Sequence, residues 1–235
     1  MKKNKILAVT LARGGSKSIK KKNLALINGR PLIYYTIKEA LKSRMITRYI
    51  VSTDDKKIKK ISEKYGAEVP FLRPKKFSTN KAKAVSADIH ALKWAEKNEG
   101  KKYDFFVELM ATNPLKTYKD IDRVLKKLIK SKADSVIGVV KVADHHPIRI
   151  KKIVNGKIVN FSKDLVEISE THRQQLKPDA YIRNGSIYAS KRNLLIKGKR
   201  YGTKNSIPYI MDSNKSINID TEIDLLVAKQ LLKKG

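Results

Sequence analysis

Leu11-Ala-Arg-Gly-Gly-Ser-Lys-Ser-Ile-Lys-Lys-Lys-Asn23 is the stretch around which the chain is organised, and it continues an apolar run over residues 6–11. A Gly29-Arg30-Pro31 turn and an amphipathic segment come after it. An apolar strand, a glycine-rich basic loop and a helix, in this order, form the layout of a phosphate-binding turn in α/β proteins. The spacings of a Walker A loop and of a G-x-G-x-x-G fingerprint are both absent.

The residue types within this loop favour a bound phosphate. Gly14 and Gly15 allow backbone angles that a side chain forbids, so that N–H groups can face an anion closely. The positive charge that a polyphosphate needs comes from Arg13, Lys17 and Lys22. A solvated basic loop is the competing interpretation, and it is the better one for the lysines at 20–22 taken alone.

Length and composition restrict the class of protein. A chain of 235 residues with 41% apolar residues can bury one substantial α/β core, with room for a small lobe. The absence of cysteine excludes disulfides, thiolate metal sites and a cysteine nucleophile. No apolar run approaches the ~20 residues of a membrane span, and the basic start of the chain precedes too short an apolar run for a signal peptide. We therefore expect a cytoplasmic protein that does not cross a membrane.

The formal net charge of +31 makes anionic partners such as nucleotide phosphates, acidic sugars or nucleic acid plausible. The lysines are spread over nearly every segment instead of forming one stripe. This distribution indicates compositional bias, or adaptation to heat or salt, more than a designed binding face, so charge alone identifies no function.

Apolar strands alternate with amphipathic helices along most of the chain. The expected strands span residues 6–11, 49–52, 68–72, 105–110, 135–142, 186–189 and 207–211. The expected helices span residues 31–43, 56–65, 84–98 and 118–132, with a last helix that ends at residue 233. Strands that alternate with helices of ~10–15 residues predict an α/β fold with a doubly wound, mainly parallel sheet. Ligands bind such sheets at the carboxyl ends of the strands, where Arg13, Asp54 and Arg73 fall.

The pattern changes after Asp144. Residues 148–161, around Asn155-Gly156, predict a β-hairpin, and the residues up to about 179 are polar and irregular. We interpret residues 145–180 as a small lobe of a single domain that covers residues 1–235.

With these pieces in view, the chain resembles the CMP-N-acylneuraminate synthetases (acylneuraminate cytidylyltransferases) over nearly its whole length. Separate blocks match that family in order, which makes the resemblance specific although each block alone is weak. The blocks are Leu11-Ala-Arg-Gly-Gly-Ser-Lys17 through Lys22-Asn23, Ile50-Val-Ser-Thr-Asp54, Leu72-Arg-Pro74, Ala111-Thr-Asn-Pro-Leu115, His145-His-Pro147, Arg173-Gln-Gln175, Arg183-Asn-Gly185 with Tyr188, and Ile219-Asp-Thr-Glu222 with Asp224.

The resemblance implies a Rossmann-like nucleotidyltransferase fold with a β-containing dimerisation lobe, and hence a homodimer. It also implies a reaction in which CTP and an acidic nine-carbon (nonulosonic) sugar of the sialic acid type give CMP-sugar and pyrophosphate, with Mg²⁺ as cofactor. Both reactants are anionic, so positioning and charge neutralisation are the main tasks of such a site.

Carried over position by position, the resemblance implies a role for each of several residues. The nucleotide would contact Leu11, Ala12, Arg13, Gly14, Gly15, Ser16, Lys17, Asn23, Arg73 and Ser86, with Arg73 on the cytidine side. The sugar would contact Met110, Thr112, Arg149 and Tyr188. Catalysis would fall to Lys22, Arg173 and Asp220, and the metal to Asp220 with Asn218. The general base cannot be identified.

Three departures from the family pattern leave the acceptor sugar open. Met110 stands where the family commonly has a glutamine that touches the sugar. Asn218 replaces the first aspartate of a terminal Asp-x-Asp pair, and it can offer a carbonyl oxygen but no charge. The small-hydroxyl positions are alanines at 82 and 84, with Ser86 nearby and lysines at 81 and 83.

Structural roles compete with several of these interpretations. Asp220 could cap the last helix as readily as it binds metal, and Asp54 is a better candidate for a helix cap than for a catalyst. His145 and His146 lack a third ligand at metal spacing, which favours a hinge or hydrogen-bonding role over zinc. Tyr188 alternates with apolar neighbours, as core residues do.

Two rival functions remain. The first is activation of the eight-carbon acid 3-deoxy-manno-octulosonate or of another nine-carbon acid such as legionaminate or pseudaminate. The second is a non-catalytic, basic nucleic-acid-binding protein on the same fold, which needs a contiguous cationic face with exposed aromatic residues. The dispersed lysines and the intact Arg13–Lys17 loop make nucleic acid an unlikely partner.

Overall fold

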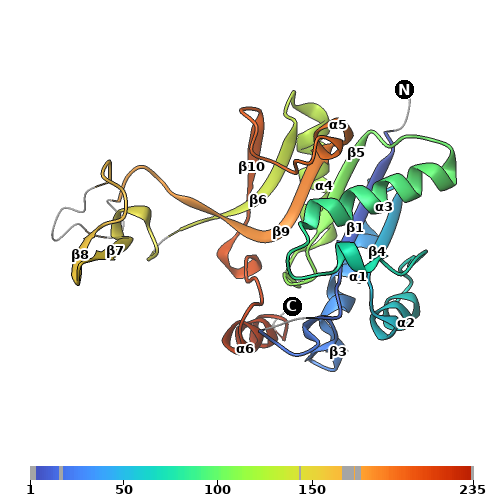
Figure 1. The fold of residues 1–235 in the computed structure, drawn as a ribbon, viewed down its shortest axis with the longest axis horizontal. Coiled ribbons are helices and arrows are strands. Elements are labelled where there is room, and N and C mark those ends of the chain that lie inside the picture. The colour runs from blue at the N-terminus through green and yellow to red at the C-terminus, as the bar shows by residue number, and fades with distance from the viewer. Residues whose placement is uncertain (1–3, 16–17, 143, 166–171, 173–175, 234–235) are drawn as a thin grey trace.

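The structure is a computed structural model, and it describes residues 4–15, 18–142, 144–165, 172 and 176–233. One six-stranded sheet in the order β10-β6-β9-β5-β1-β4 forms its centre (Figure 1). Its strands are β1 (Ile6–Leu11), β4 (Arg48–Ser52), β5 (Phe105–Leu109), β6 (Ser135–Lys141), β9 (Tyr181–Lys191) and β10 (Ser206–Ile210). Only β9 runs antiparallel to its two neighbours within this sheet, so the predicted mainly parallel α/β sheet is confirmed.

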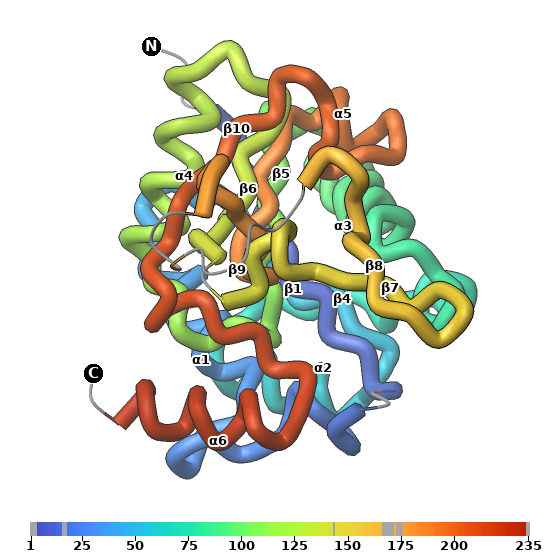
Figure 2. The backbone as a smooth tube through the Cα atoms, turned by 90° about the vertical axis from the view of Figure 1, so that its left-hand side faces the viewer, coloured from blue at the N-terminus to red at the C-terminus, as the bar shows by residue number. Residues whose placement is uncertain are grey.

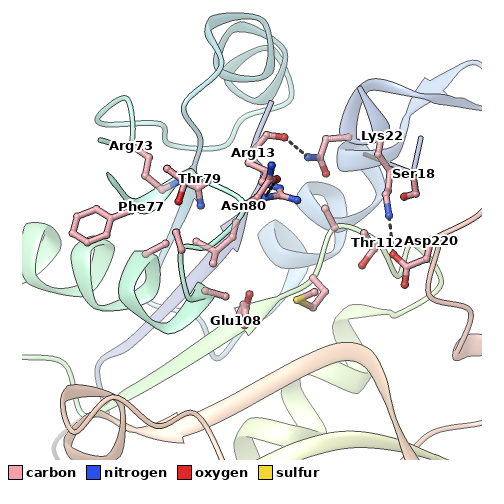
Figure 3. Close-up of a pocket in the computed structure, with 17 residues that line it drawn as sticks. Arg13, Ser18, Lys22, Arg73, Phe77, Thr79, Asn80, Glu108, Thr112 and Asp220 are labelled. Atoms are coloured by element: carbon pink, nitrogen blue, oxygen red, sulfur yellow. Dashed lines mark hydrogen bonds and ion pairs between the residues drawn. The ribbon is translucent and has the colours of Figure 1, made fainter. Parts of the chain in front are cut away.

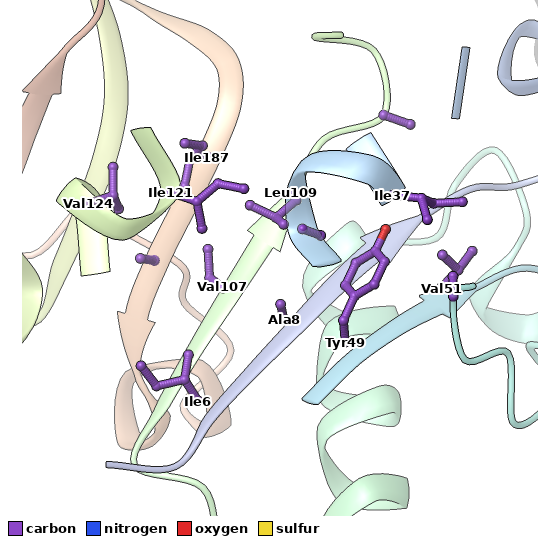
Figure 4. Packing of buried hydrophobic residues seen from close by; sticks show 14 of the residues in the cluster. Ile6, Ala8, Ile37, Tyr49, Val51, Val107, Leu109, Ile121, Val124 and Ile187 are labelled. Carbon is purple, nitrogen blue, oxygen red and sulfur yellow. The ribbon is translucent and has the colours of Figure 1, made fainter. Parts of the chain in front are cut away.

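Helices cover both faces of the sheet because successive side chains of a strand point to opposite faces. The helices are α1 (Leu32–Lys42), α2 (Lys56–Lys64), α3 (Ala84–Glu99), α4 (Tyr118–Lys130), α5 (Arg192–Ile196) and α6 (Glu222–Leu231). One apolar cluster joins α1, α2 and α4 to one face and includes Ala8, Val107 and Leu109 (Figure 4). A second cluster joins α3 and α5 to the opposite face through Val9 and Phe106. No helix within the described residues is long and apolar enough to cross a membrane.

Two of the expected strands differ from the structure. The segment at 68–72 makes only isolated bridges, at Glu68 and Leu72, because Pro70 between them has no N–H to donate to a ladder. The strand expected at 186–189 is the second half of the longer β9. Gly185, with a φ of 60°, lies where the register against β6 shifts, so β9 continues through this residue with a bulge.

The predicted hairpin is confirmed as β7 (Lys151–Val154) and β8 (Lys157–Asn160). Asn155 and Gly156 both have positive φ, 52° and 73°, as a two-residue hairpin turn requires. The hairpin lies far from the sheet, at the end of the long extensions from β6 and β9 (Figure 1). In Figure 2, which is viewed from that side, β7 and β8 lie in front of the sheet. A smaller hairpin, β2 (Leu26–Ile27) and β3 (Arg30–Pro31), links the glycine-rich loop to α1.

Candidate active site

A cavity of about 510 Å³ opens at the carboxyl ends of β1 and β5, where a parallel sheet binds its ligands (Figure 3). The residues that line it come from the glycine-rich loop, the segment before α3, the end of β5 and the approach to α6. They are Leu11, Arg13, Ser18, Lys22, Asn23, Arg73, Phe77, Thr79, Asn80, Ala82, Ala84, Ala87, Glu108, Met110, Ala111, Thr112 and Asp220.

Hydrogen bonds from neighbouring segments hold the glycine-rich loop in place. Asn23 Nδ2 donates to the carbonyl of Arg13 at 3.0 Å, and the Gly14 N–H donates to Asp54 Oδ1 at 3.1 Å. Arg13 Nη1 reaches Asn80 Oδ1 at 3.0 Å across the cavity. A Cβ at Gly14 would lie 2.8 Å from Asp55 Oδ2, so the close approach requires glycine.

Asp54 therefore braces the loop, and the expectation that it caps a helix is wrong. The cap of α2 is Asp55, whose Oδ1 accepts from the N–H groups of Lys57 and Ile58 at 2.7 and 2.9 Å.

Lys22 and Asp220 meet on one side of the cavity although they are far apart in sequence. Lys22 Nζ donates to Asp220 Oδ1 at 2.8 Å and to the carbonyl of Ile219 at 2.7 Å. Asn218 Nδ2 donates to the other oxygen of Asp220 at 2.6 Å. The helix-cap alternative for Asp220 is wrong, because Thr221 and Asp224 form a capping box at the start of α6.

Arg73 is a buried cation beside the glycine-rich loop. Its Nη2 lies 3.6 Å from Asp54 Oδ1, and its Nε donates to Ser78 Oγ at 3.1 Å. Burial lowers the pKa of the Arg73 guanidinium from its ordinary value, while the nearby Asp54 opposes the shift. Asp54 thus contacts both the glycine-rich loop and Arg73.

The structure does not bring every predicted residue to the cavity. Ser86 lines a separate apolar hollow with Trp94, and Arg149 lies in a short 3₁₀ turn (Pro147–Arg149) at the lobe. Tyr188 is buried in β9, where it stacks on Tyr201 with ring centroids 5.5 Å apart. The placement of these three residues does not support direct contact with substrate. The burial of Tyr188 agrees with the alternative that it is a core residue.

Other predicted residues stay as predictions. Ser16, Lys17 and Arg173 lie outside the described residues. Ala12 is buried, with its N–H on the carbonyl of Ser52, and Gly15 has open space where a Cβ would be. Each of these two flanks Arg13 and Gly14 without lining the cavity.

The buried His146 makes the hydrogen bonds that the sequence favoured over zinc binding. Its Nδ1 accepts from the Ile148 N–H at 3.3 Å, which leaves Nε2 to donate to the carbonyl of Pro178 at 2.9 Å. These bonds join the two chain segments that lead into the lobe.

Two buried acids near the cavity were missed by the sequence analysis. Glu108 lines the cavity and is bonded to Arg200, and Asp88 in α3 lies 3.8 Å from the same guanidinium. Burial raises the pKa of Asp88 to about 7, against the opposing charges of Arg200 and Arg73. An acid in the otherwise apolar Phe105-Phe-Val-Glu-Leu109 was the available signal for Glu108.

Lys116 supports the segment that follows β5. The side chain is fully buried, and its Nζ donates to Thr36 Oγ1 at 2.8 Å and to the carbonyls of Met110 and Asn113 at 2.6 and 2.5 Å. Burial lowers the pKa of Lys116 to about 7. These bonds fix the backbone of Met110 at the cavity edge.

A glycine-rich turn after β1, with cations converging on a cavity at the strand ends, defines an α/β nucleotide-binding protein. Residues 7–231 match the cytidylyltransferase family, and the chain belongs to that family. It is accordingly a nucleotidyltransferase enzyme.

Two curated relatives are each 30% identical to this chain. One is the CMP-N,N′-diacetyllegionaminic acid synthase of Campylobacter jejuni, matched over 97% of this chain and 94% of the relative. The other is the N-acylneuraminate cytidylyltransferase of Escherichia coli, matched over 99% of this chain but 53% of that longer protein. These matches confirm the resemblance found in the sequence.

Among solved structures, CMP:2-keto-3-deoxy-manno-octonic acid synthetase complexed with CTP superposes with a TM-score of 0.71. The alignment covers 98% of this chain and 99% of that one at 16% identity. At that identity the likeness confirms the nucleotidyltransferase fold and carries no argument about the sugar.

Proposed function

We propose that this enzyme activates an acidic nine-carbon sugar by transferring CMP to it from CTP. The anomeric hydroxyl oxygen of the sugar forms a bond to the α-phosphorus, and the bond from that phosphorus to the bridging oxygen of pyrophosphate breaks. The hydroxyl proton passes to solvent, and pyrophosphate leaves with its negative charge. The observation that carries this proposal is the meeting of Arg13, Lys22 and Asp220 in one cavity of a cytidylyltransferase.

Each of these residues has a task that suits the reaction. Arg13 lines the cavity, and its positive charge would neutralise the leaving pyrophosphate. The Lys22 ammonium, only 10% exposed at its side chain, is oriented by Asp220 and the Ile219 carbonyl. A buried, fixed cation stabilises developing charge on phosphate oxygens without having to reorganise.

The residues present fit Mg²⁺ in the manner in which that ion binds nucleotide phosphates. The Asp220 carboxylate is 62% exposed and lines the cavity, and Mg²⁺ commonly uses one or two carboxylates, substrate phosphates and water. Asn218 Oδ1 is a buried oxygen without a hydrogen-bond partner among the described residues, next to this carboxylate. Asp220 would hold the ion, with Asn218 beside it, and bound Mg²⁺ would supply positive charge to the α-phosphate.

The acceptor is proposed from the curated relatives, whose names specify nonulosonic acids. The Met110 side chain lines the cavity and offers no hydrogen bond to a sugar, whereas Thr112, two residues later, lines the same cavity and carries a hydroxyl group. We also assign the reaction to the cytoplasm, because its co-substrate is a nucleoside triphosphate.

The test is pyrophosphate release with CTP and Mg²⁺ against a panel of nonulosonic acids and 3-deoxy-manno-octulosonate, with ATP, GTP and UTP as controls. We expect CTP-dependent release with a nine-carbon acid. Release with the eight-carbon acid alone would overturn the acceptor, and failure to bind CTP would overturn the proposed function.

We further propose that the enzyme is a homodimer formed through the lobe. The two strands of the hairpin expose their apolar residues, including Ile153 and Ile158 at 77% and 74%. Nothing in the described part of the chain covers this face, and a two-stranded hairpin is at best marginally stable by itself in water. A second copy of the lobe supplies a matching apolar surface.

A further inference from the structure

Glu108 is a buried acid on a strand whose other side chains are apolar. Its side chain is 2% exposed and shares the α3 face of β5 with Phe106, yet it lines the cavity. Figure 3 shows it apart from the group formed by Lys22, Ser18 and Asp220. A carboxylate in such a position is costly unless it is paired or used.

Arg200 holds this carboxylate in a fixed position. Its Nη1 donates to Glu108 Oε2, and this is the one side-chain hydrogen bond of the Glu108 carboxylate within the described part of the chain. The guanidinium also lies over the Tyr188 ring, 5.2 Å from its centroid, and 3.8 Å from Asp88. The pair with Arg200 engages Oε2 and leaves Oε1 as an acceptor next to the cavity.

The chemistry of the two substrates restricts what can approach Glu108. The triphosphate of CTP and the carboxylate of the sugar acid are both repelled by a fixed negative charge. The neutral, flat base of the nucleotide is not repelled by such a charge. Ala82, Ala84 and Ala87 also line the cavity, and their small apolar side chains leave room for a planar ring.

The edge of a cytosine ring offers an amino group that donates and a carbonyl oxygen that accepts. Glu108 and Arg73 both line the cavity and supply the complementary acceptor and donor. Asp88 interacts electrostatically with Arg73 and with Arg200, so these groups belong to one connected cluster. Uracil carries a carbonyl oxygen where cytosine carries the amino group, and a carboxylate would repel it.

We propose that Glu108, positioned by Arg200, accepts a hydrogen bond from the cytosine amino group and so selects CTP over UTP. This inference rests on the proposed function and adds the residue that reads the base.

The test measures equilibrium binding of CTP and of UTP by calorimetry without any sugar, in the wild type and in Glu108→Gln. The wild type should prefer CTP. A glutamine can turn its amide to donate to uracil or accept from cytosine, and a charge-assisted bond is lost, so the preference should fall by about 10- to 100-fold. Glu96→Gln is the matched control, because Glu96 is likewise an acid paired with an arginine, Arg192, but does not line the cavity, and it should keep the preference.

A ligand change covers the case in which Glu108→Gln does not fold. The wild type should bind the triphosphate of pyrimidin-2-one riboside, which lacks the amino group, about 10- to 100-fold more weakly than CTP. Equal binding of that analogue, or an unchanged preference in a folded Glu108→Gln, would overturn the inference and leave the proposed function standing. If Glu108→Gln changed only the KM for the sugar in the pyrophosphate-release assay, Glu108 would contact the acceptor sugar, and the inference would be overturned. A wild type that binds no CTP would instead refute the proposed function.

Discussion

Asp220 is a carboxylate whose two oxygens are both engaged, by the Lys22 ammonium at 2.8 Å and by the Asn218 amide at 2.6 Å. Replacing it with alanine frees Lys22 and removes the proposed metal ligand at the same time. Because charge neutralisation at the α-phosphate is lost, we expect Asp220→Ala to lower turnover about 100-fold or more. CTP binding should persist or strengthen, since the cation at 22 is no longer neutralised.

The measurement is pyrophosphate release together with CTP titration by calorimetry. Glu222→Ala is a control of equal charge change, because Glu222 is an exposed acid in the first turn of α6. Unchanged turnover in Asp220→Ala would remove Asp220 from the catalytic site.

The raised pKa of Asp88 predicts how the free energy of unfolding depends on pH. Its folded pKa is raised from 3.8 to about 7 by burial, so between these pH values the folded protein binds a proton that the unfolded chain has released. The free energy of unfolding therefore falls as pH rises through this window, by at most about 1.4 kcal/mol per pH unit from this group. Asp88→Asn resembles the protonated acid and should remove this part of the dependence.

The check is the midpoint of thermal unfolding of wild type and Asp88→Asn from pH 5 to pH 8. As pH rises, the unfolding midpoint of Asp88→Asn should increase relative to that of the wild type. Asp164→Asn, at an exposed acid of the lobe, should show the same pH dependence of the midpoint as the wild type. A difference between Asp88→Asn and wild type that stays constant with pH would show that Asp88 is ionised throughout.

At the scale of elements, the segment that leaves β5 depends on one buried side chain. Lys116 Nζ donates to Thr36 Oγ1 and to two main-chain carbonyls, and Lys116→Met keeps most of the volume while leaving these three acceptors without a donor. Each unpaired buried acceptor is costly, so we expect the free energy of unfolding to fall by about 2–4 kcal/mol. Turnover should fall too, because Met110 at the cavity edge loses its support.

Urea unfolding followed by circular dichroism measures this loss. Lys119→Met, at an exposed lysine on α4, removes the same charge without a buried contact and should stay within about 0.5 kcal/mol of wild type. A Lys116→Met variant as stable as Lys119→Met would mean that water replaces the ammonium.

Most elements could be predicted because their signals are local. A few consecutive residues are enough to predict the strand at 6–11 and the Asn155-Gly156 turn, and the structure contains both. The failed strand at 68–72 also had a local reason, in Pro70. Which of two neighbouring acids, Asp54 or Asp55, caps α2 depends on the loop packed beside them, which the local sequence does not show.

The candidate site was predictable only in part, because its contacts join distant segments. The glycine-rich loop is one continuous motif, and so Arg13 and Asn23 could be assigned to it. The bond from Arg200 to Glu108 spans 92 positions in the sequence, and that from Lys22 to Asp220 spans 198. Only the resemblance to a family could place Lys22 and Asp220 in one site. None of the sequence blocks that carry this resemblance includes Arg200 or Glu108, so it did not predict their pairing.

At the scale of the whole molecule, charge and apolar surface are distributed differently. The 53 basic residues against 22 acidic ones are dispersed, so like charge opposes any association of two copies. The apolar side chains exposed on β7 and β8 are concentrated, and Ile153 and Ile158 are cross-strand partners. A dimer through the lobe therefore has to be held by apolar contact against electrostatic repulsion, and it should tighten as salt concentration rises.

In size-exclusion chromatography with light scattering at 0.15 M salt, we expect the wild type to give a dimer and Ile153→Glu with Ile158→Glu to give a monomer. Burial of each isoleucine contributes about 1.5–3 kcal/mol, and a buried carboxylate adds a desolvation cost. Ile223→Glu is the matched control, since Ile223 on α6 is similarly exposed, at 72%, and should leave the dimer intact. If the double variant stays dimeric while Ile223→Glu dissociates, the interface lies at α6 and the lobe has another partner.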